Sequence, residues 1–394
     1  MAGLLMKARL LAVVLGVGTV VGAASLAGCG SADVDERGQL LRTTAEYLWA
    51  QQGEDGGWHS ETHGLLRGGE TWTPFVAHYL FQVPDSIFAA PTGGREHALQ
   101  FIREHTTDAG ILGISDPTVL EYPNYATSYA LRVLKRWGAP PDSTLIRKMA
   151  QYLHGQQYDE LRGIGAEHPA YGAWGFGETS LPVGQVGHID LSHTRRVIEA
   201  LESTGARGEH EMKVQRFLAM LQKHPSDTRP QPGANHDDRR PPYDGGFYAS
   251  TVTVGLNKGG AVTDSLGLSY YPSYSTTTCD GVLTLLAAGV QTDDERVTSA
   301  AEWLSMHTDL TVVQGIPENP SQWQHVMFYY HLLVRSEANT ALGIGGTWPD
   351  DMVTMLTERQ RADGSFSNPD GAPNKEDDPI LATTMVVGTL LNAH

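Results

Sequence analysis

The sequence is poor in cysteine and in positive charge. Cys29 and Cys279 are the only cysteines among 394 residues. Cys29 lies in the N-terminal segment, which leaves Cys279 without a partner, so we expect no intramolecular disulfide in the mature chain. Lysine and arginine number 28 against 45 aspartates and glutamates, which gives a formal net charge of −17. This balance argues against a nucleic-acid partner and against docking on an anionic membrane through charge.

The N-terminal segment predicts export and lipid anchoring. An apolar stretch from Leu10 to Val21 follows two basic residues and is too short for a membrane span, which needs about 20 apolar residues. It leads to Leu-Ala-Gly-Cys, which ends at Cys29 and resembles the lipobox of bacterial lipoproteins. We therefore expect residues 1–28 to be a signal peptide, Cys29 to be lipidated, and residues 29–37 to form a tether. The protein would then face the extracytoplasmic side of a bacterial membrane, in the cell envelope.

An internal repeat dominates the rest of the chain. A threonine stands seven residues ahead of a leucine in five places: Thr73 with Leu80, Thr127 with Leu134, Thr194 with Leu201, Thr278 with Leu285, and Thr383 with Leu390. The segment from Val326 to Leu333 fits the same frame. Self-similarity over the whole chain indicates one copied supersecondary unit, which cannot bury its apolar face without its neighbours.

Each repeat is predicted to be a helical hairpin. Stretches with apolar residues at three- and four-residue spacing precede the frames and predict outer helices: 41–52, 96–105, 145–156, 210–222, 296–307 and 352–360. The threonine frames are more apolar all round, as expected of inner helices that pack on both sides. Thr73 is followed by Pro74, which predicts that the threonine caps its helix.

Glycine turns closed by an aromatic residue join the outer and inner helices. Examples are Gln52 to Trp58, Gly172 to Phe176, Asp244 to Phe247 and Gln360 to Phe366. Such turns, alternating with helices, resemble the repeats of the terpenoid cyclase and protein prenyltransferase superfamily. The resemblance covers nearly all of the mature chain. It implies an all-α fold, an (α/α)6 toroid of six helical hairpins over residues 38–394 whose inner ring encloses a central cavity.

The cyclase chemistry that the resemblance implies is not intact. Squalene-hopene cyclases carry their proton donor in an Asp-x-Asp-Asp-Thr run, and the matching residues here are Asp190 to Thr194. Ser192 occupies the place of the central acid, and a serine hydroxyl cannot supply a strong acid at neutral pH. Protein prenyltransferases instead bind zinc through Asp, Cys and His. Asp190 fits the first place, but Ser192 replaces the thiolate and Thr277 replaces the histidine.

Three polar residues are compatible with an enzyme. His193 and His325 each stand one residue before their frames, and Asp190 stands four before its own. Parallel inner helices would turn all three toward one end of the cavity, as zinc or iron ligands or as an acid and a base. The competing interpretation is that Asp190 only caps its helix and that His193 is a polar residue on the rim.

A lyase acting on an acidic polysaccharide is a further alternative. It would use His193 or His325 as the base and Tyr274 or Tyr329 as the acid. Arg195 or Arg196 would bind the substrate carboxylate.

Aromatic residues at the inner-helix starts predict a ligand cavity. The candidates are Trp72, Tyr129, Tyr274, Trp323 and Tyr329. Aromatic faces suit an isoprenoid, a lipid or a sugar, since they offer a large contact area at low entropic cost. We therefore expect a toroid with a degenerate active site that binds an apolar or saccharide ligand, with an enzyme related to cyclases, transferases or polysaccharide lyases as the alternative.

Overall fold

The computed structural model describes residues 35–116, 119, 121–178, 180–205, 207–229, 242–318 and 321–394. Within these residues, six outer helices alternate with six inner ones. The outer helices are α1 (Glu36–Ala50), α3 (Gly94–His105), α5 (Ser143–Gly155), α7 (Glu209–Leu221), α9 (Glu295–Met306) and α12 (Trp348–Thr357). The inner helices are α2 (Trp72–Leu80), α4 (Pro123–Trp137), α6 (Leu191–Ser203), α8 (Ser275–Ala287), α11 (Phe328–Leu342) and α13 (Pro379–Asn392).

Short elements fill the connections between these helices. They are α10 (Trp323–Val326), the antiparallel strands β1 (Val262–Thr263) and β2 (Ser269–Tyr270), and the 3-10 turns η1 (Gly64–Leu66), η2 (Pro140–Asp142), η3 (Glu160–Arg162), η4 (Val254–Leu256) and η5 (Ala372–Asn374). Among the described residues, no helix is both long and apolar enough to cross a membrane.

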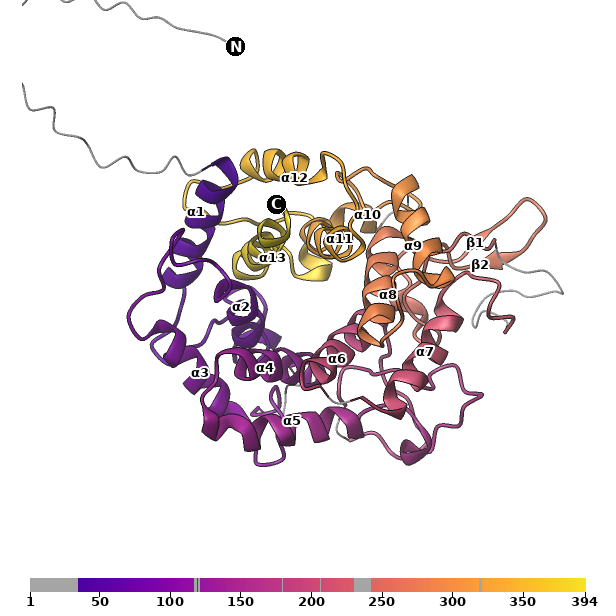
Figure 1. Cartoon of the computed structure of the whole chain (residues 1–394), viewed down its shortest axis with the longest axis horizontal. Coiled ribbons are helices and arrows are strands. Elements are labelled where there is room, and N and C mark those ends of the chain that lie inside the picture. Colours follow the sequence, from indigo (N-terminus) through magenta and orange to yellow (C-terminus); the bar gives the residue numbers. More distant parts are fainter. Residues whose placement is uncertain are drawn as a thin grey trace, which may run out of the picture. The chain divides into compact units, whose positions relative to one another are not determined.

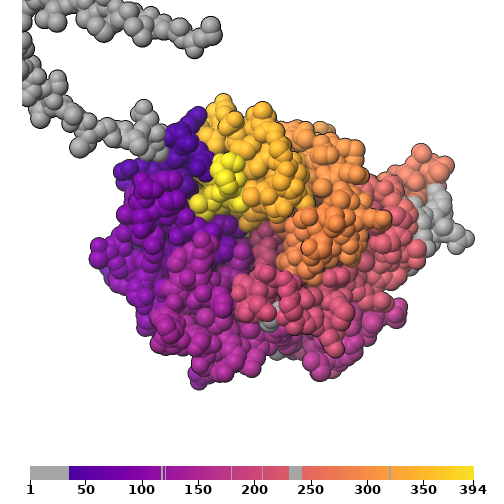
Figure 2. All heavy atoms as spheres, in the orientation of Figure 1, coloured from indigo at the N-terminus to yellow at the C-terminus, as the bar shows by residue number. Residues whose placement is uncertain are grey.

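The inner helices form a closed ring within the unit of residues 35–394. Each packs on the next in the order α2, α4, α6, α8, α11, α13, and α13 returns to α2 (Figure 1). With all atoms drawn, the yellow C-terminal segment lies directly against the indigo N-terminal helices (Figure 2). The predicted all-α toroid is confirmed. The predicted signal peptide and Cys29 lie outside the described residues, and α1 already includes the last two residues of the predicted tether.

The repeated threonines tie the inner helices to the turns before them. Thr73 is the second residue of α2 rather than its cap, so that prediction was wrong. Its hydroxyl accepts a hydrogen bond from the backbone N–H of Trp58 at 2.9 Å. The other four threonines accept in the same way: Thr127 from Leu112, Thr194 from Trp174, Thr278 from Phe247, and Thr383 from Phe366. All five side chains are fully buried, so the hydroxyl recurs because it satisfies a buried N–H in each repeat.

Glutamines at the ends of outer helices join neighbouring repeats. Gln52 Nε2 donates to the carbonyl of Gly56 in its own turn and to that of Gly94 in the next outer helix, both at 2.9 Å. Gln360 occupies the same place in the last repeat and donates to Thr43 Oγ1 at 2.7 Å. Because Thr43 lies in the first outer helix, this bond helps to close the ring.

Candidate functional site

A cavity of about 360 Å³ lies at the N-terminal ends of the inner helices. Every inner helix contributes to its wall, and loops complete it. Eight aromatic residues line it: Trp72, Phe75, Tyr122, Tyr125, Phe176, Tyr274, Trp323 and Tyr330. Its volume falls in the range of about 300–1,000 Å³ that is typical of small-molecule sites.

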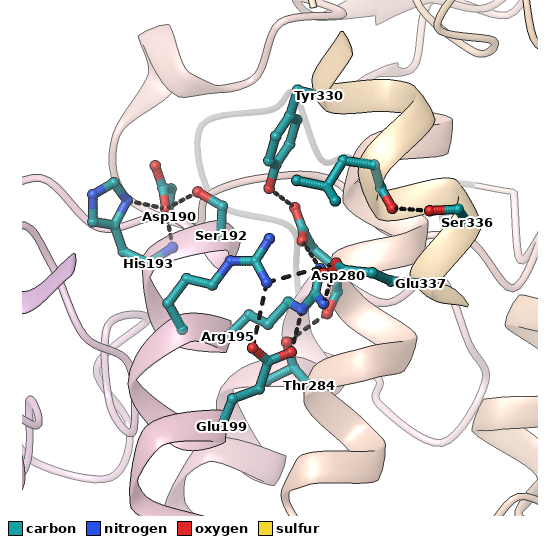
Figure 3. A network of polar contacts seen from close by, with 12 residues as sticks. Asp190, Ser192, His193, Arg195, Glu199, Asp280, Thr284, Tyr330, Ser336 and Glu337 are labelled. Atoms are coloured by element: carbon teal, nitrogen blue, oxygen red, sulfur yellow. Dashed lines mark hydrogen bonds and ion pairs between the residues drawn. The ribbon is translucent and has the colours of Figure 1, made fainter. Parts of the chain in front are cut away.

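Asp190, Ser192 and His193 form a compact polar group on one side of the wall. Asp190 is the N-cap of α6, and its Oδ1 accepts the backbone N–H of His193 at 2.8 Å. The same oxygen lies 2.9 Å from His193 Nδ1 and accepts the Ser192 hydroxyl at 3.0 Å (Figure 3). The cap that the sequence suggested is therefore present, and it also orients the histidine.

The surroundings of this group favour an ionised Asp190. Burial alone would raise the pKa of Asp190, but the charge and hydrogen bonds of His193, together with the Ser192 hydroxyl, bring it below its usual value. The His193 ring packs on Phe176, with ring centroids 4.4 Å apart, and lies near Tyr125. Since Asp190 engages Nδ1, Nε2 is the ring nitrogen left to meet a ligand.

A cluster of buried charges crosses the ring on the deeper side of the cavity. Arg195 donates to Glu199 Oε1 at 2.6 Å, to Asp280 Oδ1 at 2.9 Å and to Glu337 Oε2 at 2.6 Å (Figure 3). Arg132 and Arg196 also pair with Glu199, at 2.8 and 3.3 Å. Three guanidinium groups thus face three carboxylates, and their formal charges cancel. This ion cluster links α4, α6, α8 and α11.

The ion cluster reaches the cavity through Asp280 and Tyr330. The Tyr330 hydroxyl donates to Asp280 Oδ2 at 2.6 Å, and both residues line the wall. Burial raises the pKa of Asp280 above its ordinary value, although Arg195, Arg196 and the Tyr330 hydroxyl oppose this shift. Neither residue was among the site residues predicted from the sequence. The one available signal was a charged residue inside an otherwise apolar inner helix.

His325 does not join Asp190 and His193. It lies in α10 with an exposed side chain, and it is absent from the cavity wall. In the part of the chain that the structure describes, no three His, Cys, Asp or Glu side chains lie close enough together to hold a metal ion. The suggested zinc or iron set of Asp190, His193 and His325 is therefore not assembled.

Three of the five predicted ligand-binding aromatics line the cavity: Trp72, Tyr274 and Trp323. Tyr129 lies one helical turn beyond the wall residue Tyr125 and packs on Phe75, with ring centroids 5.1 Å apart. Tyr329 packs on Phe366 at 5.7 Å, while the next residue in sequence faces the cavity. One residue changes direction by about 100° around a helix, and the repeat frame alone did not resolve that difference.

The remaining candidates have structural partners or lie elsewhere. Arg195 and Arg196 are buried in the ion cluster, so they are not available to a substrate carboxylate. Burial raises the pKa of the Cys279 thiol to about 12, which keeps it protonated. Burial also raises the pKa of Tyr274, whose side chain does line the wall.

Comparisons with known proteins establish the fold. No protein-family model matches the chain, and no curated protein matches its sequence. Among solved structures, a variant of the type II terpene cyclase MstE from Scytonema with its product merosterolic acid A matches 91% of this chain and 97% of its own, at 16% identity and a TM-score of 0.55. Another MstE variant, with the substrate geranylgeranyl dihydroxybenzoate, gives 16% identity, 91% and 97% coverage and a TM-score of 0.52. A protein from Actinoplanes matches 91% of this chain and 99% of its own, at 16% identity and a TM-score of 0.53. This chain therefore has a terpenoid cyclase-like toroid fold.

Proposed function

We propose that this protein binds an apolar, prenyl-type small molecule in its central cavity. The observation that carries the proposal is the cavity wall, to which all six inner helices contribute and in which eight aromatic residues lie. Leucine and methionine side chains fill the gaps between the rings: Leu66, Leu191, Leu256, Met327, Leu381 and Met385. Burial of a hydrocarbon against such a surface is favourable by about 25 cal/mol per Å².

The two carboxylates of the wall favour an apolar ligand over a saccharide. A sugar needs many hydrogen-bonding partners, but Asp280 is already held by Arg195 and Tyr330. Asp190 is likewise held by its own helix and by His193. The MstE structures with a geranylgeranyl substrate and with a merosterolic acid product support the same ligand class for this fold.

Equilibrium dialysis with farnesol, a C15 isoprenoid alcohol, tests this proposal. Leu381 lines the cavity, so Leu381→Phe takes up part of its volume and is expected to weaken farnesol binding about tenfold or more. Leu161 is 86% exposed and lies outside the wall, so Leu161→Phe is the matched control and keeps the affinity of the wild type. Equal farnesol affinities in all three proteins would contradict the proposal.

An acid–base enzyme is the second candidate, and the Asp190–His193 contact supports it. A carboxylate that holds Nδ1 fixes the ring and its tautomer, which prepares Nε2 to accept or donate a proton in the cavity. Protonation of an alkene requires a stronger acid than an imidazolium, and Ser192 stands where the cyclases place theirs. The pair therefore fits proton transfer to or from an activated substrate better than squalene-type cyclisation.

Incubation with geranylgeranyl dihydroxybenzoate in D2O separates binding from catalysis. Recovery of unchanged compound is the result expected of a binding protein. Deuterium exchanged into the recovered compound by the wild type, but not by His193→Ala, would establish enzymatic proton transfer instead. His325→Ala is the control for a histidine outside the cavity, and it should behave as the wild type in either case.

The proposed setting is the outer face of a bacterial membrane. The Leu-Ala-Gly-Cys motif supports it, with Cys29 as the lipidated residue. A lipid-anchored toroid would stand next to the bilayer, from which apolar molecules partition.

A further inference from the structure

We propose that the ligand is an anionic amphiphile, whose phosphate or carboxylate head group is bound by Lys258 and Lys375 at the cavity while its hydrocarbon chain lies among the aromatic side chains. This inference rests on the proposed function and names the chemistry of the ligand. It starts from the two lysines in the cavity wall, neither of which lies on an inner helix.

The two ammonium groups contact aromatic rings and not carboxylates, and Lys258 Nζ also donates to the carbonyl of Gly255 at 3.1 Å. Lys258 Nζ lies 4.0 Å from the centroid of the Trp323 ring, and Lys375 Nζ lies 5.4 Å from that of Tyr122. Both rings also line the cavity. Within the described ranges, no carboxylate forms an ion pair with either lysine. A cation over a ring retains capacity for an anion, because the ring neutralises no charge.

The three acidic residues that follow Lys375 in the sequence are engaged elsewhere. Both oxygens of Glu376 accept backbone N–H groups at the start of α11, each at 2.9 Å. Asp377 pairs with His63 at 2.7 Å. Asp378 caps α13 through the N–H of Ile380 at 2.9 Å. None of these carboxylates is therefore free to neutralise the lysine.

The negative charge of Asp190 attracts the Lys258 ammonium, but the same carboxylate is hydrogen-bonded to His193. Burial lowers the pKa of the Lys258 ammonium, Asp190 opposes this shift, and Lys375 adds to it. The positive charge of Lys375 thus repels that of Lys258, and both side chains line the same cavity. An anionic group placed between them would relieve that repulsion and the cost of burying Lys258.

Backbone strain gathers at the same place. Three non-glycine residues among those described have positive φ: Tyr122 at 50°, Gln322 at 47° and Lys375 at 66°. Tyr122 and Lys375 contact each other in the wall, and Gln322 directly precedes Trp323. Left-handed backbone is unfavourable for residues with a Cβ, and it concentrates where a fold holds side chains for a ligand. Here it presents both cation–ring pairs to the cavity.

The test compares head groups on one hydrocarbon chain. Farnesol, farnesyl phosphate, farnesoic acid and inorganic phosphate are dialysed below their micellar concentrations against the full chain carrying Cys29→Ser. We expect at least one of the two anionic amphiphiles to bind about tenfold or more tightly than farnesol. Tighter binding of the phosphate identifies a phospholipid-type head group, and tighter binding of the acid identifies a carboxylate. Either result supports the inference.

Lysine variants show where the preference arises. Lys258→Met and Lys375→Asn should each remove most of the advantage that the anion has over farnesol, since each removes one positive charge from the head-group site. Asparagine tolerates positive φ, which protects the fold at position 375. Lys258→Arg should retain the preference, and Lys135→Met, at an exposed position outside the wall, should have no effect.

Other outcomes overturn the inference in distinguishable ways. If farnesol binds as tightly as the anions, or if the lysine variants keep the preference, the head-group site is refuted while the proposed function stands. If inorganic phosphate binds as tightly as farnesyl phosphate, the lysines form an ion site and not an amphiphile site. If none of the isoprenoid compounds binds, the proposed function itself fails.

Discussion

Arg195→Met tests whether the buried ion cluster is a balanced unit. The side chain is 3% exposed and pairs with three carboxylates, on Glu199, Asp280 and Glu337. Methionine preserves much of its volume but removes its charge and all three ion pairs. Two arginines then remain for three buried carboxylates, and the cluster carries a net negative charge inside the ring.

The expected loss is large for a single substitution. Removing one partner of a buried ion pair costs about 3–5 kcal/mol, because the other partner is left as an uncompensated buried charge. We expect the free energy of unfolding to fall by about that amount at pH 8. Arg207→Met is the matched control, since the side chain of Arg207 is 54% exposed and pairs at the surface with Glu202 and Glu211. Exposed pairs of this kind contribute about 0–1 kcal/mol.

Two further results follow from charge balance. In Arg195→Met, Asp280 loses a counter-charge that opposes the rise in its pKa, so its folded pKa should rise further above the unfolded value. The carboxyl then takes up a proton at low pH, and the loss of stability should be smaller at pH 5 than at pH 8. Arg195→Met combined with Glu337→Leu leaves two charges of each sign, and the double variant should be more stable than the sum of the single changes predicts.

Urea unfolding followed by tryptophan fluorescence and by far-ultraviolet circular dichroism measures these effects. A loss below about 1 kcal/mol for Arg195→Met at pH 8 would refute the reasoning, since it would equal that of an exposed pair. Additive effects in the double variant would also refute it, because independent contacts rather than a balanced cluster would then hold the charges.

Three further predictions concern other parts of the molecule. Burial raises the pKa of Glu376 to about 7, so between its unfolded value near 4.5 and 7 the folded state binds more protons and stability falls as pH rises. When unfolding is measured at pH 5 and at pH 8, Glu376→Gln should lose less stability between the two pH values than the wild type loses. An equal loss in the two proteins would contradict this assignment of the pH dependence to Glu376. Thr127→Val leaves the buried N–H of Leu112 without its acceptor and should lower the free energy of unfolding by about 1–3 kcal/mol in urea titrations. Thr298→Val, at an exposed site, is the control, and equal losses in the two variants would show that the bond from Leu112 to Thr127 does not stabilise the fold. Cys29→Ser should abolish palmitate labelling and release the protein from membranes, whereas labelling that persists would place the lipid elsewhere.

The helical architecture could be predicted because its sequence signals are local and recur in each repeat. The frame that joins Thr127 to Leu134 recurs around the ring, and each copy reinforces the reading of the others. The role of the threonine was misread, because Thr73 and Pro74 also fit a helix start. Only the folded chain brings the hydroxyl to the N–H of Trp58, 15 residues earlier.

The sequence by itself thus determined the number and order of the hairpins and the division into outer and inner helices. Hydrophobic periodicity and turn residues are signals that extend over only a few residues, so they can be recognised without knowledge of the fold. Tertiary structure alone decided which side chains meet across the ring. Arg195 finds carboxylates 85 and 142 residues away, His325 is turned out of the cavity, and Lys258 and Lys375 are brought into it. Those outcomes depend on the angle of each helix and on the path of each loop, which no single repeat encodes.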